Sequence, residues 1–237
     1  MNFKSFRRSL REAIRKIRLG CFNKFSQISF SQECEDLLLL NLIGKSKSGF
    51  YVDVGGFDPI RFSNTYLFYK RGWNGIIIEP NPDAESRFRR IRKRDIFVPE
   101  GIALNASELD FYRFKEPALN TFNKELAVVR EKIDGREIID IITRRLSPLS
   151  FILDRYSNGT EIDILSVDAE GMDFEVLKSN NWKKYRPRFL VVEINLAHEE
   201  QGYITELYKN PTCMYLVKQG YNAVIKTGRS VIFKKSR

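Results

Sequence analysis

Short apolar runs alternate with segments of helical periodicity from residue 29 to the end of the 237-residue chain. An apolar run bounded by turn residues is typical of a buried strand, whereas apolar residues three and four positions apart mark one helix face. Strands are therefore predicted over Phe50–Val54, Gly75–Glu79, Ile96–Leu104, Leu109–Phe114, Ile162–Val167 and Arg188–Ile194. Helices are predicted over Leu37–Ile43, Thr65–Arg71, a segment beginning at Asn81-Pro82-Asp83, Ser147–Tyr156, Asp173–Ser179 and Asn210–Gly220.

Strands that alternate with helices predict an α/β fold, in which a mostly parallel sheet is covered by helices on both faces. The chain ends differently, because Tyr221–Lys226 and Ser230–Lys235 read as a hairpin across Thr227-Gly228-Arg229. This C-terminal antiparallel hairpin would place one antiparallel strand in the sheet. The segment Ala118–Arg145 has the least regular pattern, and we expect it to form a flap over a site.

Capping residues support several of the predicted helix starts. Ser31 precedes acidic residues that suit the first turn of a helix, and Ser63 or Asn64 is placed to cap the next one. No repeat or low-complexity linker divides the chain. We therefore predict one domain over residues 29–237, preceded by a leader over residues 1–28.

The leader carries most of the excess positive charge. The formal net charge is +10, and residues 1–20 hold seven Lys and Arg against one Glu, which leaves only +4 for the rest. Its apolar residues recur three and four positions apart, as on one helix face: Phe3, Phe6, Leu10, Ile14 and Ile17. This pattern is typical of a helix lying on an anionic membrane. A terminal helix packed on the domain and a mitochondrial presequence are the alternatives.

The remaining composition narrows the class of protein. No apolar run approaches the roughly 20 residues that span a bilayer, and no secretory signal pattern is present. The three cysteines, Cys21, Cys34 and Cys213, lack metal-ligand and disulfide spacing, which favours a cytoplasmic protein, with peripheral contact at the inner membrane face as an option. A body charge of +4 does not favour nucleic acid as a partner. The oligomeric state stays open.

Two strand ends carry residues suited to a nucleoside with positive charge. Asp53 lies in the first strand just before Gly55 and Gly56, and Glu79 ends the second strand. Glycines let the backbone approach a ligand closely, and a carboxylate accepts hydrogen bonds from ribose hydroxyls. The G-x-G-x-x-G spacing that holds a pyrophosphate is absent, and an acid precedes the glycines. The pattern therefore favours a sulfonium nucleoside over a dinucleotide.

Several blocks, in order, resemble the FkbM-type methyltransferase family. They are Ser31-Gln32 with Glu35-Asp36, Phe50–Pro59, Ser63–Tyr69, Gly72-Trp73, Ile78–Pro82, Ile162–Gly171 with Asp173 and Val176-Leu177, and Val191–Glu193. The resemblance begins near residue 29 and omits the leader. It implies a class I (Rossmann-like) methyltransferase that uses S-adenosyl-L-methionine, usually on a hydroxyl of a sugar, glycolipid or polyketide.

The resemblance also assigns residues to the cofactor. It implies that Asp53, Gly55 and Gly56 line its methionine part, that Glu79 holds the ribose, and that Asn105 lies near the adenine. The helix start formed by Ser63, Asn64 and Thr65 could bind the cofactor carboxylate through backbone N–H groups, and Gln32 could approach the same pocket. For Gln32 and Asn105, ordinary capping and turn chemistry is the alternative.

Methylation of an alcohol needs a group that aligns the hydroxyl and accepts its proton. Asp168 and Glu170 follow the predicted strand Ile162–Val167, beside the expected methyl position, and His198 follows the predicted strand Arg188–Ile194. These three are the catalytic candidates. Asp168, Glu170 and Glu193 together could also hold Mg²⁺, although the sequence does not require a metal and none is predicted.

Two other classes of function remain open at this point. An NAD-dependent oxidoreductase could share the architecture, but it would need a pyrophosphate loop. A non-catalytic, membrane-associated binding module could keep the fold without turnover. An N- or carboxyl-methyltransferase is a further option, because the cofactor half does not specify the acceptor atom.

Overall fold

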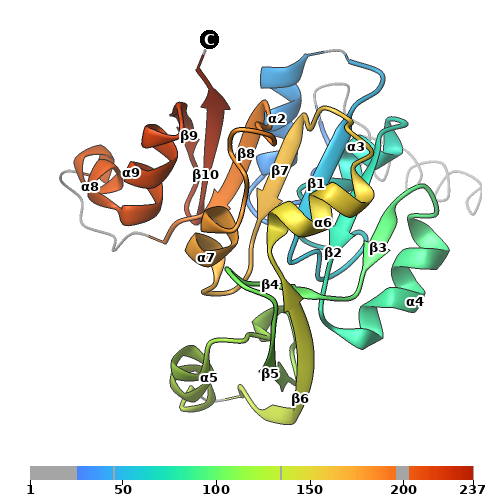
Figure 1. Ribbon diagram of the computed structural model, residues 1–237, viewed down its shortest axis with the longest axis vertical. Coiled ribbons are helices and arrows are strands. Elements are labelled where there is room, and N and C mark those ends of the chain that lie inside the picture. Colours follow the sequence, from blue (N-terminus) through green and yellow to red (C-terminus); the bar gives the residue numbers. More distant parts are fainter. Residues whose placement is uncertain (1–25, 45, 134, 196–202, 237) are drawn as a thin grey trace, which may run out of the picture.

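The computed structural model describes residues 26–44, 46–133, 135–195 and 203–236. Within these residues a seven-stranded sheet has the order β3-β2-β1-β7-β8-β10-β9 (Figure 1). Its strands are β1 (Phe50–Val54), β2 (Asn74–Ile78), β3 (Ile96–Val98), β7 (Ile164–Val167), β8 (Phe189–Glu193), β9 (Tyr221–Lys226) and β10 (Ser230–Lys235). The leader predicted over residues 1–28 lies almost entirely outside the described residues.

The sheet confirms the predicted α/β class. Strands β1, β2, β3, β7 and β8 are parallel, whereas β10 pairs antiparallel with both β8 and β9. The C-terminal hairpin therefore supplies the one reversed strand, as the sequence predicted. The strand order changes direction between β1 and β7, and ligands of such sheets bind at that point, outside the carboxyl ends of the strands.

Helices cover both faces of the sheet. One face packs against α2 (Glu35–Ile43), α3 (Tyr66–Lys70) and α4 (Pro82–Ile91). The other packs against α6 (Leu149–Tyr156), α7 (Asp173–Lys178), α8 (Tyr203–Lys209) and α9 (Pro211–Lys218). Because side chains alternate along a strand, Tyr51 faces the helices α2, α3 and α4, whereas Val52 faces the helices on the other side of the sheet. Both side chains are fully buried. None of the described helices is both long and apolar enough to cross a membrane.

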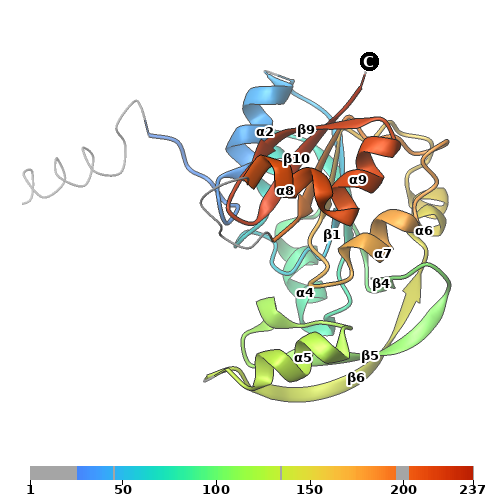
Figure 2. The ribbon, with the colours of Figure 1, turned by 90° about the vertical axis from the view of Figure 1, so that its left-hand side faces the viewer.

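A second, smaller sheet forms a lobe at the carboxyl ends of the main strands (Figures 1 and 2). This lobe, residues 101–147, contains β4 (Gly101–Ile102), β5 (Ser107–Phe114), the 3₁₀ turn η1 (Pro117–Leu119), α5 (Lys124–Glu131) and β6 (Ile138–Ser147). Strand β6 lies in the middle, antiparallel to β5 and parallel to β4. Arg113 on β5 forms an ion pair with Asp83 of α4, which joins the lobe to the main domain.

Two predictions for this region were wrong. Ile96–Leu104 is not one strand: it breaks at Pro99, and its second part leaves the main sheet to pair with β6. Proline lacks the N–H that a continuous ladder needs at that position. The segment Ala118–Arg145 is not irregular, since it holds α5 and most of β6, a largely exposed strand that is held by pairing with β5 rather than by an apolar pattern of its own.

Element ends agree with the prediction within two or three residues at most sites. The start of α2 differs, because the cap position is Cys34, with φ 66°, and not Ser31. Ser31 instead donates to the Asp36 carboxylate and accepts from its backbone N–H. The cap position of α3 is Thr65, and not Ser63 or Asn64 as predicted, although the Ser63 hydroxyl accepts from the N–H of Tyr66, the first residue of the helix, at 3.1 Å.

Candidate cofactor and acceptor site

A cavity of about 380 Å³ opens at the carboxyl ends of β1, β2, β7 and β8. Residues of the main sheet form one side of it, and residues 116–122 of the lobe form the other. Among the predicted site residues, Gln32, Gly55, Glu79, Asp168 and Glu170 line this cavity. The segment predicted to be a flap thus contributes part of the wall, although it is a folded sheet and helix.

Gly55 makes the turn that brings β1 against the end of β7. Its φ is +79°, and a Cβ at this position would lie 1.7 Å from the backbone oxygen of Asp168. No side chain fits there, so glycine is required both for the backbone conformation and for the close approach. Gly56 does not line the cavity; a Cβ there would meet Ile77 at 2.5 Å. Its predicted cofactor contact stays a prediction.

Glu79 follows β2 and places its carboxylate at the cavity wall. The two oxygens accept from the N–H of Asn81 at 2.7 Å and of Phe57 at 2.8 Å. Burial nevertheless raises the pKa of Glu79 to about 7, against the opposing effect of these bonds. Each oxygen keeps a further lone pair, so the carboxylate can still accept hydrogen bonds from the two ribose hydroxyls of a nucleoside.

Asp53 lies beneath the glycine turn and does not line the cavity. It shares the face of β1 that carries Tyr51, so it points toward α3 and α4. Thr65 donates to the Asp53 carboxylate at 2.5 Å, and the buried guanidinium of Arg92 donates to the Thr65 hydroxyl at 2.9 Å. Burial raises the pKa of Asp53, and the charge of Arg92 opposes this shift.

Ser63, Asn64 and Thr65 also lie outside the cavity lining. Ser63 accepts from Arg92 at 3.2 Å, and Asn64 donates to the Ser166 hydroxyl of β7 at 3.1 Å. Together with Asp53, these three residues form a polar layer beneath the Gly55 turn. The cofactor contacts predicted for these four residues therefore stay predictions.

Two predicted residues remain, Asn105 and His198, and the structure describes only the first of them. Asn105 is exposed in the turn between β4 and β5 and does not line the cavity. His198 lies outside the described residues. The adenine contact of Asn105 and the catalytic role of His198 stay predictions.

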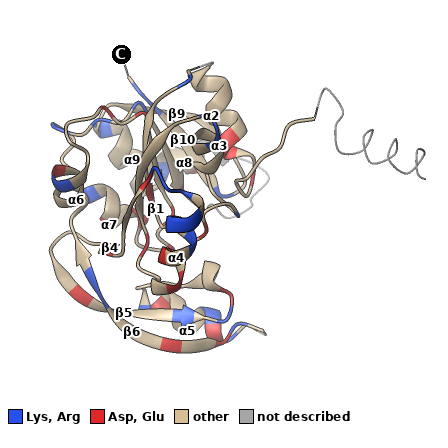
Figure 3. Cartoon of the chain, turned by 90° about the vertical axis from the view of Figure 1, so that its right-hand side faces the viewer, with Lys and Arg blue, Asp and Glu red and all other residues tan. Residues whose placement is uncertain are grey.

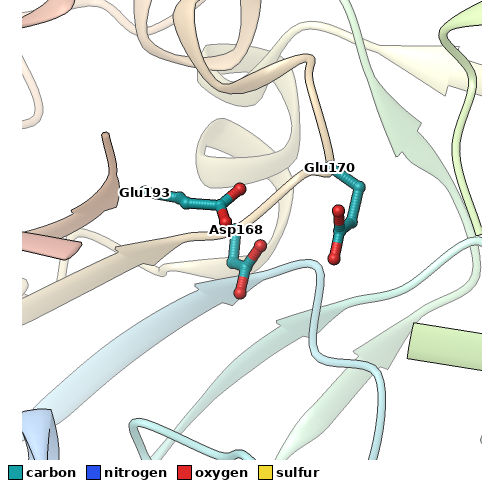
Figure 4. Close-up of side chains that lie close together, drawn as sticks. All are labelled: Asp168, Glu170 and Glu193. Carbon is teal, nitrogen blue, oxygen red and sulfur yellow. The ribbon is translucent and has the colours of Figure 1, made fainter. Parts of the chain in front are cut away.

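Three carboxylates meet at the ends of β7 and β8 (Figure 4). One oxygen each of Asp168, Glu170 and Glu193 lies within 4.8 Å of the other two. Asp168 Oδ1 is buried and accepts no hydrogen bond from the residues that the structure describes. Burial, and then the charges of Glu193 and Glu170, raise the pKa of Asp168 well above its usual range. The sequence predicted this juxtaposition from neighbouring strand ends.

Glu170 connects the main domain to the lobe. It has φ +48°, in the left-handed region, and its backbone oxygen accepts from the Thr121 hydroxyl at 2.7 Å. Its carboxylate forms an ion pair with Arg130 of α5. Burial raises the pKa of Glu170, and Arg130 opposes the shift. Arg130 and Arg92 were not predicted, because the partners that define their roles are distant in sequence.

The fold and the cavity together define a class I methyltransferase. The reversed strand β10 lies between β8 and the edge strand β9, the Gly55 turn packs directly against the Asp168 backbone, and the Glu79 carboxylate lines the cavity with lone pairs that can accept from a ribose. The family model of the FkbM methyltransferase domain matches residues 53–222. The chain belongs to this family, and it is a methyltransferase whose cofactor is S-adenosylmethionine.

Solved structures with a similar fold are distant. A putative O-methyltransferase from Klebsiella pneumoniae has 9% identity and a TM-score of 0.44, covering 86% of this chain and 80% of its own. A 1,6-didemethyltoxoflavin N1-methyltransferase from Burkholderia thailandensis, with S-adenosylhomocysteine bound, has 10% identity and a TM-score of 0.42. The match covers 100% of this chain and 92% of that enzyme's chain. No curated protein sequence matches the chain significantly. The acceptor is therefore not given by any of these likenesses.

Proposed function

We propose that the protein transfers the methyl group of S-adenosylmethionine to a hydroxyl of a sugar, a glycolipid or a related small molecule. One observation carries the proposal: Asp168 lines the cavity beside the Gly55 turn, with a buried carboxylate oxygen that has no hydrogen-bond partner among the described residues. An acid in this position can accept a hydrogen bond from an acceptor hydroxyl and align it with the methyl group.

The reaction is an in-line displacement at the methyl carbon. The bond from the acceptor oxygen to the methyl carbon forms while the sulfur–methyl bond breaks, and S-adenosylhomocysteine leaves. The hydroxyl proton passes to the Asp168 carboxylate. The activated methyl group belongs to the cofactor, so the protein contributes binding, alignment and the proton acceptor.

The rest of the cavity suits a polyhydroxylated acceptor. Its acidic side chains can accept hydrogen bonds from several hydroxyls. Aromatic rings of the β1 loop, Phe57 and Phe62, and of the lobe, Phe111 and Phe122, line the same space and offer apolar surface to the ring of a sugar.

The experiment is a turnover assay with radiolabelled S-adenosylmethionine across a panel of sugars, glycolipids, amines and carboxylic acids. We expect transfer to a hydroxyl, and a loss of about 100-fold or more in kcat for Asp168→Asn, with the affinity for S-adenosylhomocysteine retained. Glu161→Gln, an exposed acid remote from the cavity lining, is the control and should keep full activity. Transfer only to nitrogen or carboxyl acceptors, or full activity of Asp168→Asn, would refute the proposal.

A further inference from the structure

We infer that Asp168, Glu170 and Glu193 bind one divalent cation of the Mg²⁺ or Mn²⁺ kind, which in turn binds an oxygen of the acceptor. The inference rests on the proposed function in so far as the cation serves methyl transfer. The binding site itself is argued from the arrangement of the three side chains.

The spacing of the three carboxylates fits a cation of this size. Their nearest oxygens lie within 4.8 Å of one another. Two oxygens on opposite sides of an ion are separated by twice the metal–oxygen distance, which is about 4.0–4.2 Å for Mg²⁺ and about 4.6–5.2 Å for Ca²⁺. Three oxygens around one ion cannot all lie opposite one another, so at least two of the three separations in a bound cluster are shorter than these values. The carboxylates would therefore move closer together on a bound ion, and more so for Mg²⁺ than for Ca²⁺. Carboxylate oxygens are also the ligands that these ions prefer.

Asp168 gives the second and independent observation. Its Oδ1 atom is buried and has no hydrogen-bond donor among the described residues. A buried carboxylate oxygen without a partner is unfavourable, because it has lost water and gained nothing in exchange. In Figure 4 the Asp168 carboxylate lies between those of Glu193 and Glu170. A cation at this point would supply the missing partner.

The hydrogen bonds and the ion pair of the three carboxylates leave lone pairs on their oxygens that can bind a cation. Glu170 gives one oxygen to Arg130, and Glu193 accepts from the Asn195 amide at 3.0 Å. Asp173 follows Glu170 closely and adds a further acid, although its carboxylate accepts from the N–H groups of Ala169 and Gly171. Two guanidinium groups, those of Arg130 and Arg229, act on Glu170, and they face the three clustered carboxylates and Asp173. A divalent ion would balance this charge.

A bound cation has a direct chemical consequence for the acceptor. Coordination of a hydroxyl oxygen lowers the pKa of that hydroxyl and fixes its position. The cation enters no bond that is made or broken, and the proton leaves through the second oxygen of Asp168. Open coordination positions favour an acceptor with two neighbouring oxygens, such as a vicinal diol of a sugar.

The test is a titration of metal-free, full-length protein with Mn²⁺ alone, followed by electron paramagnetic resonance of the free ion. We expect one Mn²⁺ per chain, displaced by Mg²⁺ or Ca²⁺. Asp168→Asn and Glu193→Gln should each weaken Mn²⁺ binding by at least about tenfold, whereas Glu161→Gln should not change it. No uptake by the wild type, or the same uptake in both cluster variants, would overturn the inference.

Failure of this inference can be told apart from failure of the proposed function. S-adenosylhomocysteine uptake and methyl transfer without any Mn²⁺ uptake would remove the cation and keep the methyltransferase. Mn²⁺ uptake without methyl transfer to any hydroxyl would keep the cation site and remove the proposed acceptor class. Circular dichroism confirms that each variant is folded, and Glu193→Gln at a strand end provides a second variant independent of the buried Asp168.

Discussion

The acids around the cavity differ in how much they are stabilised in the charged form. Glu79 is held by two backbone N–H groups, yet burial still raises its pKa to about 7. Burial and the like charges of neighbouring acids act in the same direction on Asp168, and both raise its pKa. Their chemistry follows from these surroundings rather than from residue type.

The pKa of Glu79 predicts how cofactor affinity depends on pH. Ribose hydroxyls donate to the ionised carboxylate, so affinity should fall as the pH drops through 7 and Glu79 becomes protonated. Between pH 8 and pH 6 the ionised fraction changes by roughly tenfold. Isothermal titration of S-adenosylhomocysteine at several pH values measures this change. Glu79→Gln should bind weakly with a flat profile, and the same pH profile in that variant would contradict the assignment.

The Gly55 turn gives a second prediction at this scale. Gly55→Ala would place a methyl group 1.7 Å from the Asp168 backbone oxygen, so the turn must shift. We expect a loss of at least tenfold in S-adenosylhomocysteine affinity. Gly159→Ala is the matched control, because it has a similar φ of +73° and open space around it. That control should lose about 1–2 kcal/mol of stability from backbone conformation alone and keep its affinity. Equal losses of affinity in both variants would refute the role of the turn.

Residue patterns in the sequence predicted several residues that line the cavity, but not the polar layer that lies beneath it. Gly55, Glu79, Asp168 and Glu170 were predicted because strand ends converge at one edge of a parallel sheet. Asp53 was predicted at the cavity, but the alternation of β1 turns it toward the helices. The residues that contact Asp53 come from other elements, and such contacts leave no local pattern in the sequence. The polar layer around Asp53 could therefore not be predicted.

At the scale of elements, Arg92 joins β1, α3 and the segment before β3. It follows α4, a helix with several basic side chains (Figure 3). Its guanidinium forms an ion pair with Asp95 at 2.7 Å, and both side chains are almost fully buried. It also donates to Ser63 and Thr65. This arrangement holds β1, the start of α3 and the segment before β3 together beneath the Gly55 turn.

Removal of Arg92 should therefore destabilise the fold strongly. Arg92→Met leaves Asp95 and Asp53 buried without their cation, which costs about 3–5 kcal/mol. Arg89→Met removes an exposed pair with Glu85 one turn earlier and should cost less than about 1 kcal/mol. Urea unfolding followed by circular dichroism measures both. Similar free energies of unfolding for the two variants would show that the buried network adds little.

The elements themselves were predictable where each strand is buried on both faces. β1, β2, β7 and β8 are short apolar runs, and the Asn-Pro pairs at the starts of α4 and α9 provide caps that the sequence shows. β6 was missed because it is largely exposed and mixes Asp, Thr and Arg with isoleucine. Its strand conformation depends on pairing with β5 and β4, which a local pattern does not encode.

At the scale of the whole molecule, the role of the leader can be tested separately from that of the methyltransferase domain. Its sequence predicts binding to an anionic surface, since basic residues accompany one apolar face. Deletion of residues 1–20 should weaken binding to vesicles that contain phosphatidylglycerol and leave S-adenosylhomocysteine affinity unchanged. Neutral phosphatidylcholine vesicles are the control. Equal binding of the full-length and shortened chains to anionic vesicles would contradict the prediction.

The central claim is that the Gly55 turn and the Glu79 carboxylate together hold S-adenosylmethionine at the carboxyl edge of the sheet. Calorimetric titration of the folded, full-length protein with S-adenosylhomocysteine tests it most directly. We predict uptake of one molecule per chain at pH 8, reduced by at least tenfold in Glu79→Gln. No uptake by protein with an intact circular dichroism spectrum would contradict the account.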